Sequence, residues 1–243
     1  ITADSTVVLT GTWGQSSPQN NITRSWWVFK YWGFSNAQVK ILNGGNDVFA
    51  YHHPENMVTT VEFPVPSTFS VKHIRVDEMD RYRASFGEVH DDAMNGVYNR
   101  GEKVLFSTLG SIQVGSKYFP STGGMMASLP RGAGQITAGA GNLLVNDPDG
   151  SGLKVFLTDP AILETLFVDL NTGANMLPAD KNTRITTYCG SGMSTSPWSF
   201  LLQEVLGYTN VAIYDGSMGE WGALSRYKAA TVSEATPATP ANK

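Results

Sequence analysis

The side chain with the most distinctive chemistry is Cys189, the single cysteine of a 243-residue chain. It lies within the sequence TYCGSGMSTSP, among glycines and hydroxyl side chains. The apolar run at residues 184–188 predicts a β-strand that ends at the cysteine. Pro197 suits the first turn of a helix, with Ser196 or Thr195 as its cap. We therefore expect Cys189 at a strand-to-helix turn, which is where open parallel sheets carry their sites.

This position favours a nucleophilic cysteine. The unpaired N–H groups and the dipole of a helix N-terminus stabilise negative charge on a thiol that lies just ahead of it. Gly190 and Gly192 allow the backbone to turn its N–H groups toward the sulfur. A lone cysteine can also be a small buried apolar residue. Packing alone, however, requires neither two glycines nor the neighbouring hydroxyls, so the pattern favours a thiolate.

Composition and charge limit the classes of partner. Seventeen basic and 21 acidic residues give a net charge of −4, without a long run of either sign, so no nucleic-acid surface is expected. A single cysteine excludes an internal disulfide framework and any multi-cysteine metal site. No run of about 18 apolar residues is present, so no membrane span is expected. The partners should be small molecules or proteins.

Two features bear on where the protein works. The chain begins with Ile1, which suggests processing, and a removed signal peptide is one ordinary cause. The surface-type residues are poor in lysine and rich in Asn, Gly, Ser and Thr, which suits an exported protein. We expect a periplasmic or otherwise exported protein, with a cytoplasmic location as the alternative.

The sequence contains an internal repeat. Residues 6–50 and 184–223 share the order strand, loop, helix, Gly-aromatic-x-Asn turn, strand and Gly turn. The matching pairs are Gly33 and Gly207, Phe34 and Tyr208, Asn36 and Asn210, Ile41 and Ile213, Gly44 and Gly216, and Phe49 and Trp221. Strands that alternate with helices predict a parallel sheet with helices on its faces.

The second copy is preceded by segments that complete an α/β domain. We expect a helix at 77–95, a strand at 103–107, a short strand at 135–142 and a helix at 159–170, with a Gly-rich loop between the first strand and the second. No such segments precede the first copy, so its sheet would lack about half of its strands. An N-terminal fragment or a partner chain is therefore expected to complete it.

The predicted organisation is α/β with two tandem domains. Residues 1–60 form the C-terminal half of a first domain, and 61–70 form a linker stiffened by spaced prolines. Residues 71–229 form a complete second domain, and 230–243 form a frayed tail. The first copy has Gly11 near the position of Cys189, so it cannot perform thiol chemistry.

Several segments resemble rhodanese-type sulfurtransferases. CGSGMS, followed by a helix and by LGYTNVAIYDGSMGEWGA, is similar to the family's C-terminal part, in which a cysteine heads a six-residue loop and a Gly-Ser-x-x-Glu-Trp turn closes the domain. The CGSG form is most similar to mercaptopyruvate sulfurtransferases. GQITAGAGN resembles the family's Gly-His-Ile-Pro-Gly-Ala-x-Asn segment, and SWWVFKYWGFSNAQVKILNGG resembles the end of its silent first domain. The resemblance implies tandem rhodanese-like domains, each a central parallel sheet flanked by helices, with the first domain incomplete.

The resemblance implies a sulfurtransferase in which Cys189 carries a persulfide. The thiolate attacks the sulfane sulfur of thiosulfate or 3-mercaptopyruvate, and a thiol or cyanide acceptor then removes that sulfur. Neither a metal nor another cofactor is expected. Ser191 occupies the position of a loop serine that the mercaptopyruvate branch uses. The loop N–H groups that stabilise the thiolate and the persulfide belong to Gly190, Ser191, Gly192, Met193 and Ser194.

Some positions depart from the family pattern. Residues 107–109 read Ser-Thr-Leu where the family has an Asp-x-Arg strand end, and Gln135 replaces the histidine of Gly-His-Ile-Pro. An anionic donor needs a cation, and Lys117 and Arg131 are the candidates in the Gly/Met-rich loop. These departures leave an alternative open, a catalytically weak rhodanese-like sulfur carrier or protein-interaction module.

Two other patterns could hold a metal but have plainer interpretations. Residues 147–152 have the opening spacing of a calcium loop, yet Thr158 replaces the bidentate glutamate and Lys154 adds an opposing charge. A polar turn explains them better. His52 and His53 are neighbours in what reads as an extended segment, so they should point to opposite sides. We expect two surface histidines.

Three further patterns bear on other possible functions. A phosphatase related by fold would need an arginine at position 195, which is Thr195. Residues 192–196 miss the last glycine of a hydrolase nucleophile elbow. The aromatic run at 26–32 covers nearly every face of a short helix, which is typical of a core or a domain interface rather than a ligand site.

Overall fold

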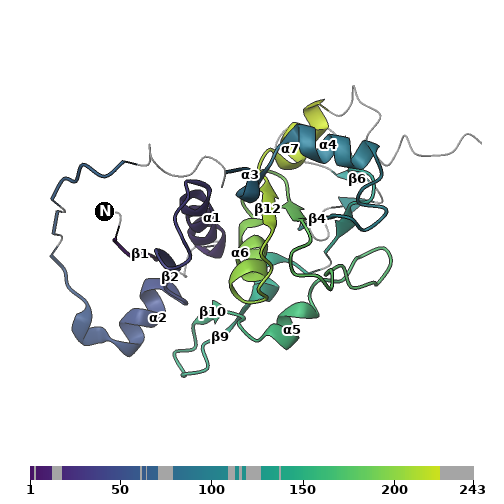
Figure 1. Ribbon diagram of the computed structural model, residues 1–243. Helices are drawn as coiled ribbons and strands as arrows, with labels where there is room; N and C mark the ends of the chain where they lie inside the picture. The colour runs from purple at the N-terminus through teal and green to yellow at the C-terminus, as the bar shows by residue number, and fades with distance from the viewer. Residues whose placement is uncertain are drawn as a thin grey trace, which may run out of the picture.

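A computed structural model shows two units, an N-terminal unit formed by the described residues up to 60 and a C-terminal unit formed by those from 79 to 224 (Figure 1). The predicted tail, 230–243, lies outside the described residues. The structure describes residues 1–2, 4–12, 18–60, 62–63, 65–70, 79–108, 113–114, 117–118, 127–136 and 138–224.

The C-terminal unit is built on a five-stranded sheet in which every pairing is parallel. The strands, in spatial order, are β3 (Arg83–Ala84), β12 (Val211–Tyr214), β11 (Ile185–Tyr188), β4 (Val104–Ser107) and β8 (Gly134–Gln135). All residues of β11 and β12 are buried. A parallel sheet in this state must be covered on both faces.

Helices supply that cover. On one face, Tyr188 of β11 packs in an apolar cluster with Trp221, and on the other, Ile185 packs in a cluster with Trp198. Successive strand residues point to opposite faces, which is why one strand feeds both clusters. The first face carries α4 (Phe86–Met94) and α7 (Ser217–Leu224), and the second carries α5 (Pro160–Glu164) and α6 (Ser196–Glu204).

The N-terminal unit repeats the second half of the C-terminal unit. Its elements are β1 (Val7–Leu9), α1 (Pro18–Tyr31), β2 (Val39–Ile41) and α2 (Gly45–His52), and a short 3₁₀ helix, η1 (Pro54–Asn56), follows. This is the order of β11, α6, β12 and α7. In both units the two strands pair in parallel.

A pair of equivalent hydrogen bonds fixes the correspondence between the two copies. Asn46 N–H, in the first turn of α2, donates to Gly11 C=O at 2.9 Å, and Met218 N–H, in the first turn of α7, donates to Cys189 C=O at 3.0 Å. Gly11 therefore stands where the second copy has its cysteine. The repeat inferred from the sequence extends to individual backbone bonds.

Smaller elements surround the main sheet. They are α3 (Met79–Tyr82), the 3₁₀ helix η5 (Ala140–Leu143), an antiparallel hairpin of β9 (Leu144–Asn146) and β10 (Lys154–Phe156), and a small antiparallel sheet of β5 (Gln113–Val114), β6 (Lys117–Tyr118) and β7 (Ala127–Ser128). Among the described residues, no helix has the length and apolar character needed to cross a bilayer.

Three element predictions need correction. The helix expected at 77–95 is interrupted, because 83–84 pair with β12 and Ser85 caps a new helix by accepting from Glu88 N–H. The strand expected at 135–142 ends at Gln135. The helix expected at 159–170 ends at Glu164, and the chain then forms an isolated bridge between Asp169 and Ile136.

The two units share an apolar interface. Trp26 and Trp27 of α1 are buried in one cluster with Tyr82 and Ile213 of the C-terminal unit, and Trp26 meets the Phe200 ring edge-on at 5.2 Å between centroids. The aromatic run therefore packs α1 against α6 (Figure 1). Bringing this helix to the C-terminal unit also brings its polar residues near the Cys189 loop.

Candidate active site

The Cys189 loop begins at the carboxyl edge of the central sheet. Cys189 follows β11 directly, and Thr108 N–H, just past the end of β4, donates to Tyr188 C=O at 2.9 Å. The next ordered element is α6, which begins at Ser196 with Pro197 in its first turn. The predicted strand-loop-helix position of Cys189 is what the structure contains.

The turn after β12 holds the start of the loop. Cys189 N–H donates to Ser217 Oγ at 3.2 Å, and the Ser217 hydroxyl donates to Tyr214 C=O at 2.8 Å. Met218 N–H and Gly219 N–H donate to the carbonyls of Cys189 and Gly190, both at 3.0 Å. Ser217 is fully buried and has φ of 50°, an uncommon conformation for a residue with a Cβ. These bonds fix the cysteine backbone at both its N–H and its C=O.

The middle of the loop turns sharply and leaves donors available. Gly192 has φ of 80°, and Ser196 closes the turn by donating its N–H to Met193 C=O and its hydroxyl to Gly192 C=O, each at 3.1 Å. Within the described part of the chain, no hydrogen bond engages the N–H groups of residues 190–195. Such N–H groups ahead of a helix are suited to an anion.

The thiol itself lies beneath the loop. Cys189 is only 1% exposed, whereas Ser191 is exposed and Gly190, Met193 and Ser194 are partly exposed. Although buried, Cys189 belongs to none of the three apolar core clusters of the described residues. The thiol is therefore buried without being part of these packed clusters.

Arg24 is a residue that the sequence analysis missed. From α1 of the N-terminal unit, its guanidinium forms an ion pair with the Asp215 carboxylate and donates to Gly192 C=O at 3.4 Å. The guanidinium also lies over the Trp27 ring, 4.3 Å from its centroid. Arg24 and Trp27 are three residues apart, so they share a helix face, and this spacing next to an interface aromatic was the available signal.

The two candidate cations remain predictions. Lys117 lies in β6, where the structure describes the backbone but not the side chain. Arg131 lies partly exposed in the turn before β8. Gln135, which replaces the family histidine, is fully buried, and its N–H donates to the Asp169 carboxylate at 3.0 Å.

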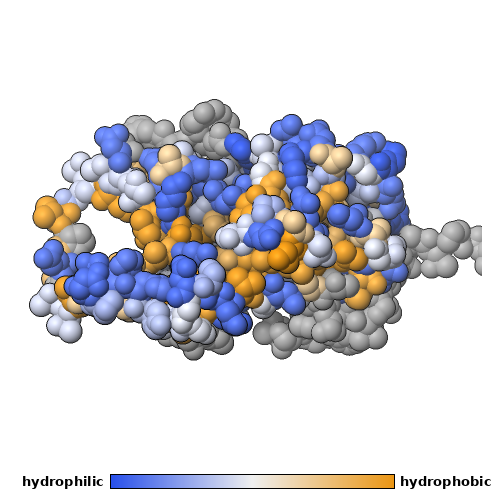
Figure 2. Space-filling model, turned by 90° about the horizontal axis from the view of Figure 1, so that it is seen from below, coloured by the Kyte–Doolittle hydropathy of each residue, from blue (hydrophilic) through white to orange (hydrophobic). Residues whose placement is uncertain are grey.

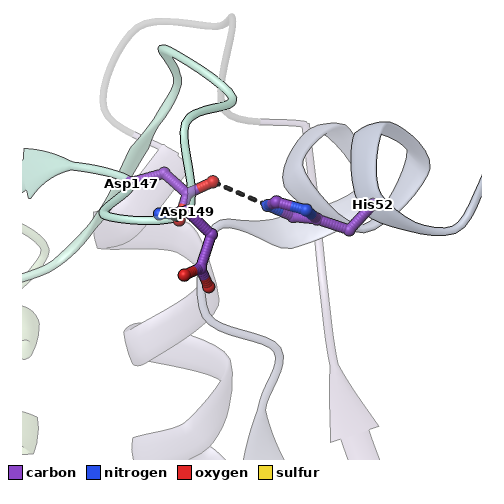
Figure 3. Close-up of side chains that lie close together, drawn as sticks. All are labelled: His52, Asp147 and Asp149. Atoms are coloured by element: carbon purple, nitrogen blue, oxygen red, sulfur yellow. Dashed lines mark hydrogen bonds and ion pairs between the residues drawn. The ribbon is translucent and has the colours of Figure 1, made fainter.

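The structure brings together two motifs that the sequence analysis treated separately. His52, from α2, meets Asp147 and Asp149, from the turn between β9 and β10 (Figure 3). His52 is part of a helix rather than an extended segment, and it makes a cross-unit contact while His53 stays on the surface.

The fold and the loop define a class before any comparison. They describe an open parallel α/β protein in which a single cysteine stands at the carboxyl end of a central strand and heads a tight loop into a helix. A family model for the rhodanese-like domain matches residues 144–224, the part that contains this cysteine.

Similar proteins agree with that match. The chain is 31% identical over 205 residues to the thiosulfate sulfurtransferase of Corynebacterium glutamicum, covering 82% of this chain and 59% of the relative. It is 31% identical over 230 residues to a Haloferax volcanii protein named "Putative thiosulfate sulfurtransferase", covering 92% and 68%. The chain therefore belongs to the rhodanese-type sulfurtransferase family, and it spans roughly three fifths to two thirds of the length of these relatives.

A solved structure supports the fold independently. The anaerobic ergothioneine biosynthesis enzyme from Chlorobium limicola superposes with a TM-score of 0.62 at 17% identity, covering 92% of this chain and 50% of that one. At this identity the likeness concerns the fold. The region shared with that enzyme extends over both units of the present chain.

Proposed function

We propose that the protein transfers a sulfane sulfur from thiosulfate or 3-mercaptopyruvate to a thiol or cyanide through a persulfide on Cys189. The observation that carries the proposal is the position of the thiol, at the end of β11 and ahead of α6, beside a run of backbone N–H groups that make no hydrogen bond within the described chain. Thiosulfate is favoured as the donor because two relatives carry that substrate in their names.

The chemistry proceeds in two displacements. The Cys189 thiolate attacks the outer sulfur of thiosulfate, an S–S bond forms as the original S–S bond breaks, and sulfite leaves with the bonding electron pair. With 3-mercaptopyruvate, a C–S bond breaks instead, and the carbon takes up a proton to give pyruvate. An acceptor thiolate or cyanide then attacks the outer sulfur of the persulfide and releases the Cys189 thiolate. The loop N–H groups can stabilise negative charge on either sulfur without moving.

Intact-mass measurement tests this directly. After incubation with thiosulfate and removal of excess donor, the chain should gain the mass of one sulfur atom, and added cyanide should remove it and yield thiocyanate. Cys189→Ser should show neither the gain nor the thiocyanate. The substitution leaves the backbone bonds to Ser217 and Met218 in place, so circular dichroism should be unchanged.

Two outcomes would contradict the proposal. An unmodified wild-type chain across thiosulfate and 3-mercaptopyruvate would favour the alternative of an interaction module that retains the rhodanese fold, whereas loading without turnover would favour a catalytically weak sulfur carrier. Equal sulfur loading in Cys189→Ser would place the chemistry elsewhere. The buried state of the thiol gives the alternative its support, because a donor must reach the sulfur through the loop.

We also propose that another polypeptide segment completes the sheet of the N-terminal unit. Among the described residues β1 pairs only with β2, and Val8 in its middle is 55% exposed. The extended stretch that follows η1 carries Val58, Phe63 and Val65, all exposed. Figure 2 shows hydrophobic surface on this side of the molecule, around the gap that the stretch spans. An open strand edge beside apolar side chains is a template for strand addition.

A further inference from the structure

The cluster of His52, Asp147 and Asp149 lies outside the sulfur-transfer site and joins the two units. His52 is the last residue of α2, and both aspartates lie in the turn of the β9–β10 hairpin. One ligand-type atom from each of the three side chains lies within 4.8 Å of the other two. Figure 3 shows the His52 imidazole facing the Asp147 carboxylate, with the Asp149 side chain next to Asp147 on the hairpin turn.

The Asp147 carboxylate is the fixed part of the cluster. Its side chain is 5% exposed, and its Oδ2 lies 2.8 Å from His52 Nε2. The N–H groups of Asp149 and Ser151 donate to Oδ1 and Oδ2 at 3.2 and 3.4 Å. The Asp147 carboxylate is therefore held in place both by the backbone of its own turn and by His52.

A second contact fixes α2 relative to the β9–β10 hairpin. Phe156 N–H, in β10, donates to Asn43 Oδ1 at 2.7 Å, and Asn43 lies just before α2. Val155 of the hairpin packs close to Gly44. A Cβ added at Gly44 would lie 3.1 Å from Val155 Cγ1. The hairpin and α2 are therefore positioned by their own packing. The imidazole and the carboxylates face each other on a scaffold that does not depend on the His52–Asp147 bond alone.

We propose that His52, Asp147 and Asp149 form a binding site for a divalent transition-metal ion, with Zn²⁺ as the best-matched probe. One imidazole and two carboxylates are a ligand set that zinc accepts, and two negative charges balance the charge of the ion. Calcium is a poorer match because it prefers oxygen ligands throughout. The ion would bridge the N-terminal and C-terminal units.

Small side-chain movements suffice to form the site. Zinc–nitrogen and zinc–oxygen bonds of about 2.0 to 2.2 Å place neighbouring ligand atoms about 3.3 to 3.6 Å apart in a tetrahedron. The three ligand atoms lie within 4.8 Å of one another, so no pair must close by more than about 1.5 Å, and the His52–Asp147 pair, at 2.8 Å, must open slightly. Asp149 can supply this movement, since it is exposed and its carboxylate accepts no hydrogen bond among the described residues. Solvent can provide the fourth ligand.

Isothermal titration calorimetry with Zn²⁺ tests the proposal on the full chain. The titrations are done in a Cys189→Ser background, because a thiolate also binds zinc. One equivalent of Zn²⁺ should bind, and saturating Zn²⁺ should raise the midpoint of thermal unfolding. His52→Ala and Asp149→Asn should each weaken binding by about 100-fold or more, since even outer-shell partners are worth about 10- to 100-fold.

His53→Ala is the matched control. His53 is adjacent in sequence, exposed, and pairs only locally with Glu55 at 3.6 Å. This variant should bind Zn²⁺ as the background does. The proposal is overturned if the background protein binds no Zn²⁺, if His52→Ala binds it unchanged, or if His53→Ala loses binding to the same extent. Because Asp149 is exposed, its variant also reports on the site if His52→Ala disturbs folding.

Discussion

At the level of single residues, Arg24 and Asp215 make the contact that joins the N-terminal unit to the Cys189 loop. The guanidinium is partly exposed, pairs with Asp215 and donates to the Gly192 carbonyl. Because its charge is already balanced by Asp215, we infer that it positions the loop rather than gripping the donor anion. Arginine suits this role, since its planar fork can serve two acceptors together.

Arg24→Gln should slow persulfide formation by about tenfold, which corresponds to roughly 1.4 kcal/mol of activation free energy. Alkylation of Cys189 by neutral iodoacetamide and by anionic iodoacetate should slow by similar factors, because the loop has lost its support. Arg24→Lys keeps the charge but not the planar fork. Its rate of persulfide formation should lie between those of the wild type and Arg24→Gln. A rate that drops only with iodoacetate, together with a raised KM for thiosulfate at unchanged kcat, would show that Arg24 binds the anion instead.

At the level of elements, the strand-loop-helix connection depends on a glycine with a left-handed backbone. Gly192 has φ of 80°, and a Cβ at this position would lie 2.8 Å from Asp215 Oδ1 and 2.9 Å from the Asp215 carbonyl. Gly207, in the turn after α6, has a similar φ of 73° but no atom within 4 Å of an added Cβ. Substitution of Gly207 therefore tests backbone strain alone, whereas substitution of Gly192 adds a steric clash to the same strain.

Gly207→Ala should lower the free energy of unfolding by about 1 kcal/mol, the cost of a left-handed residue with a Cβ. Gly192→Ala should cost about 2 to 4 kcal/mol, because overpacking is added to the same strain. Only Gly192→Ala should abolish sulfur loading. Chemical denaturation and the intact-mass assay measure the two effects. Equal destabilisation by both substitutions would show that the contact with Asp215 is unimportant.

At the level of the whole molecule, the two units are held by an apolar interface and by polar contacts at separate places. The α1 tryptophans pack on α6, Arg24 reaches the Cys189 loop, and His52 reaches the β9–β10 hairpin. The N-terminal unit thus contributes to the surroundings of the Cys189 loop even though its own copy has Gly11 in place of the cysteine.

If a strand is added at the open edge of β1, purified protein should contain a second polypeptide or a second copy of the chain. Native mass spectrometry and light scattering report this composition. A charge introduced in the middle of β1, as in Val8→Lys, should release the bound segment, because it opposes strand pairing at the edge. Its solvent-exposed position makes folding of the variant a fair expectation. A monomeric, folded wild-type chain with no additional polypeptide would contradict the proposal.

The sequence predicted the main architecture and the thiol site because both are local patterns. The repeat, the parallel strands and the strand-loop-helix position of Cys189 follow from apolar runs, glycines and a helix cap that lie close together in the chain. Element limits were less well predicted where tertiary pairing intervenes. Residues 83–84 interrupt a helical stretch because β12 offers them a partner, and Asp169 leaves a predicted helix to meet the chain at Ile136.

By itself, the sequence determined the α/β class, the internal repeat and the strand-to-helix position of the single thiol. Only the tertiary structure decided which distant side chains meet. Arg24 and Asp215 are 191 residues apart, and His52 and Asp147 are 95 apart. No local propensity records such contacts, because they arise only when the two units pack, α1 against α6 and α2 against the β9–β10 hairpin.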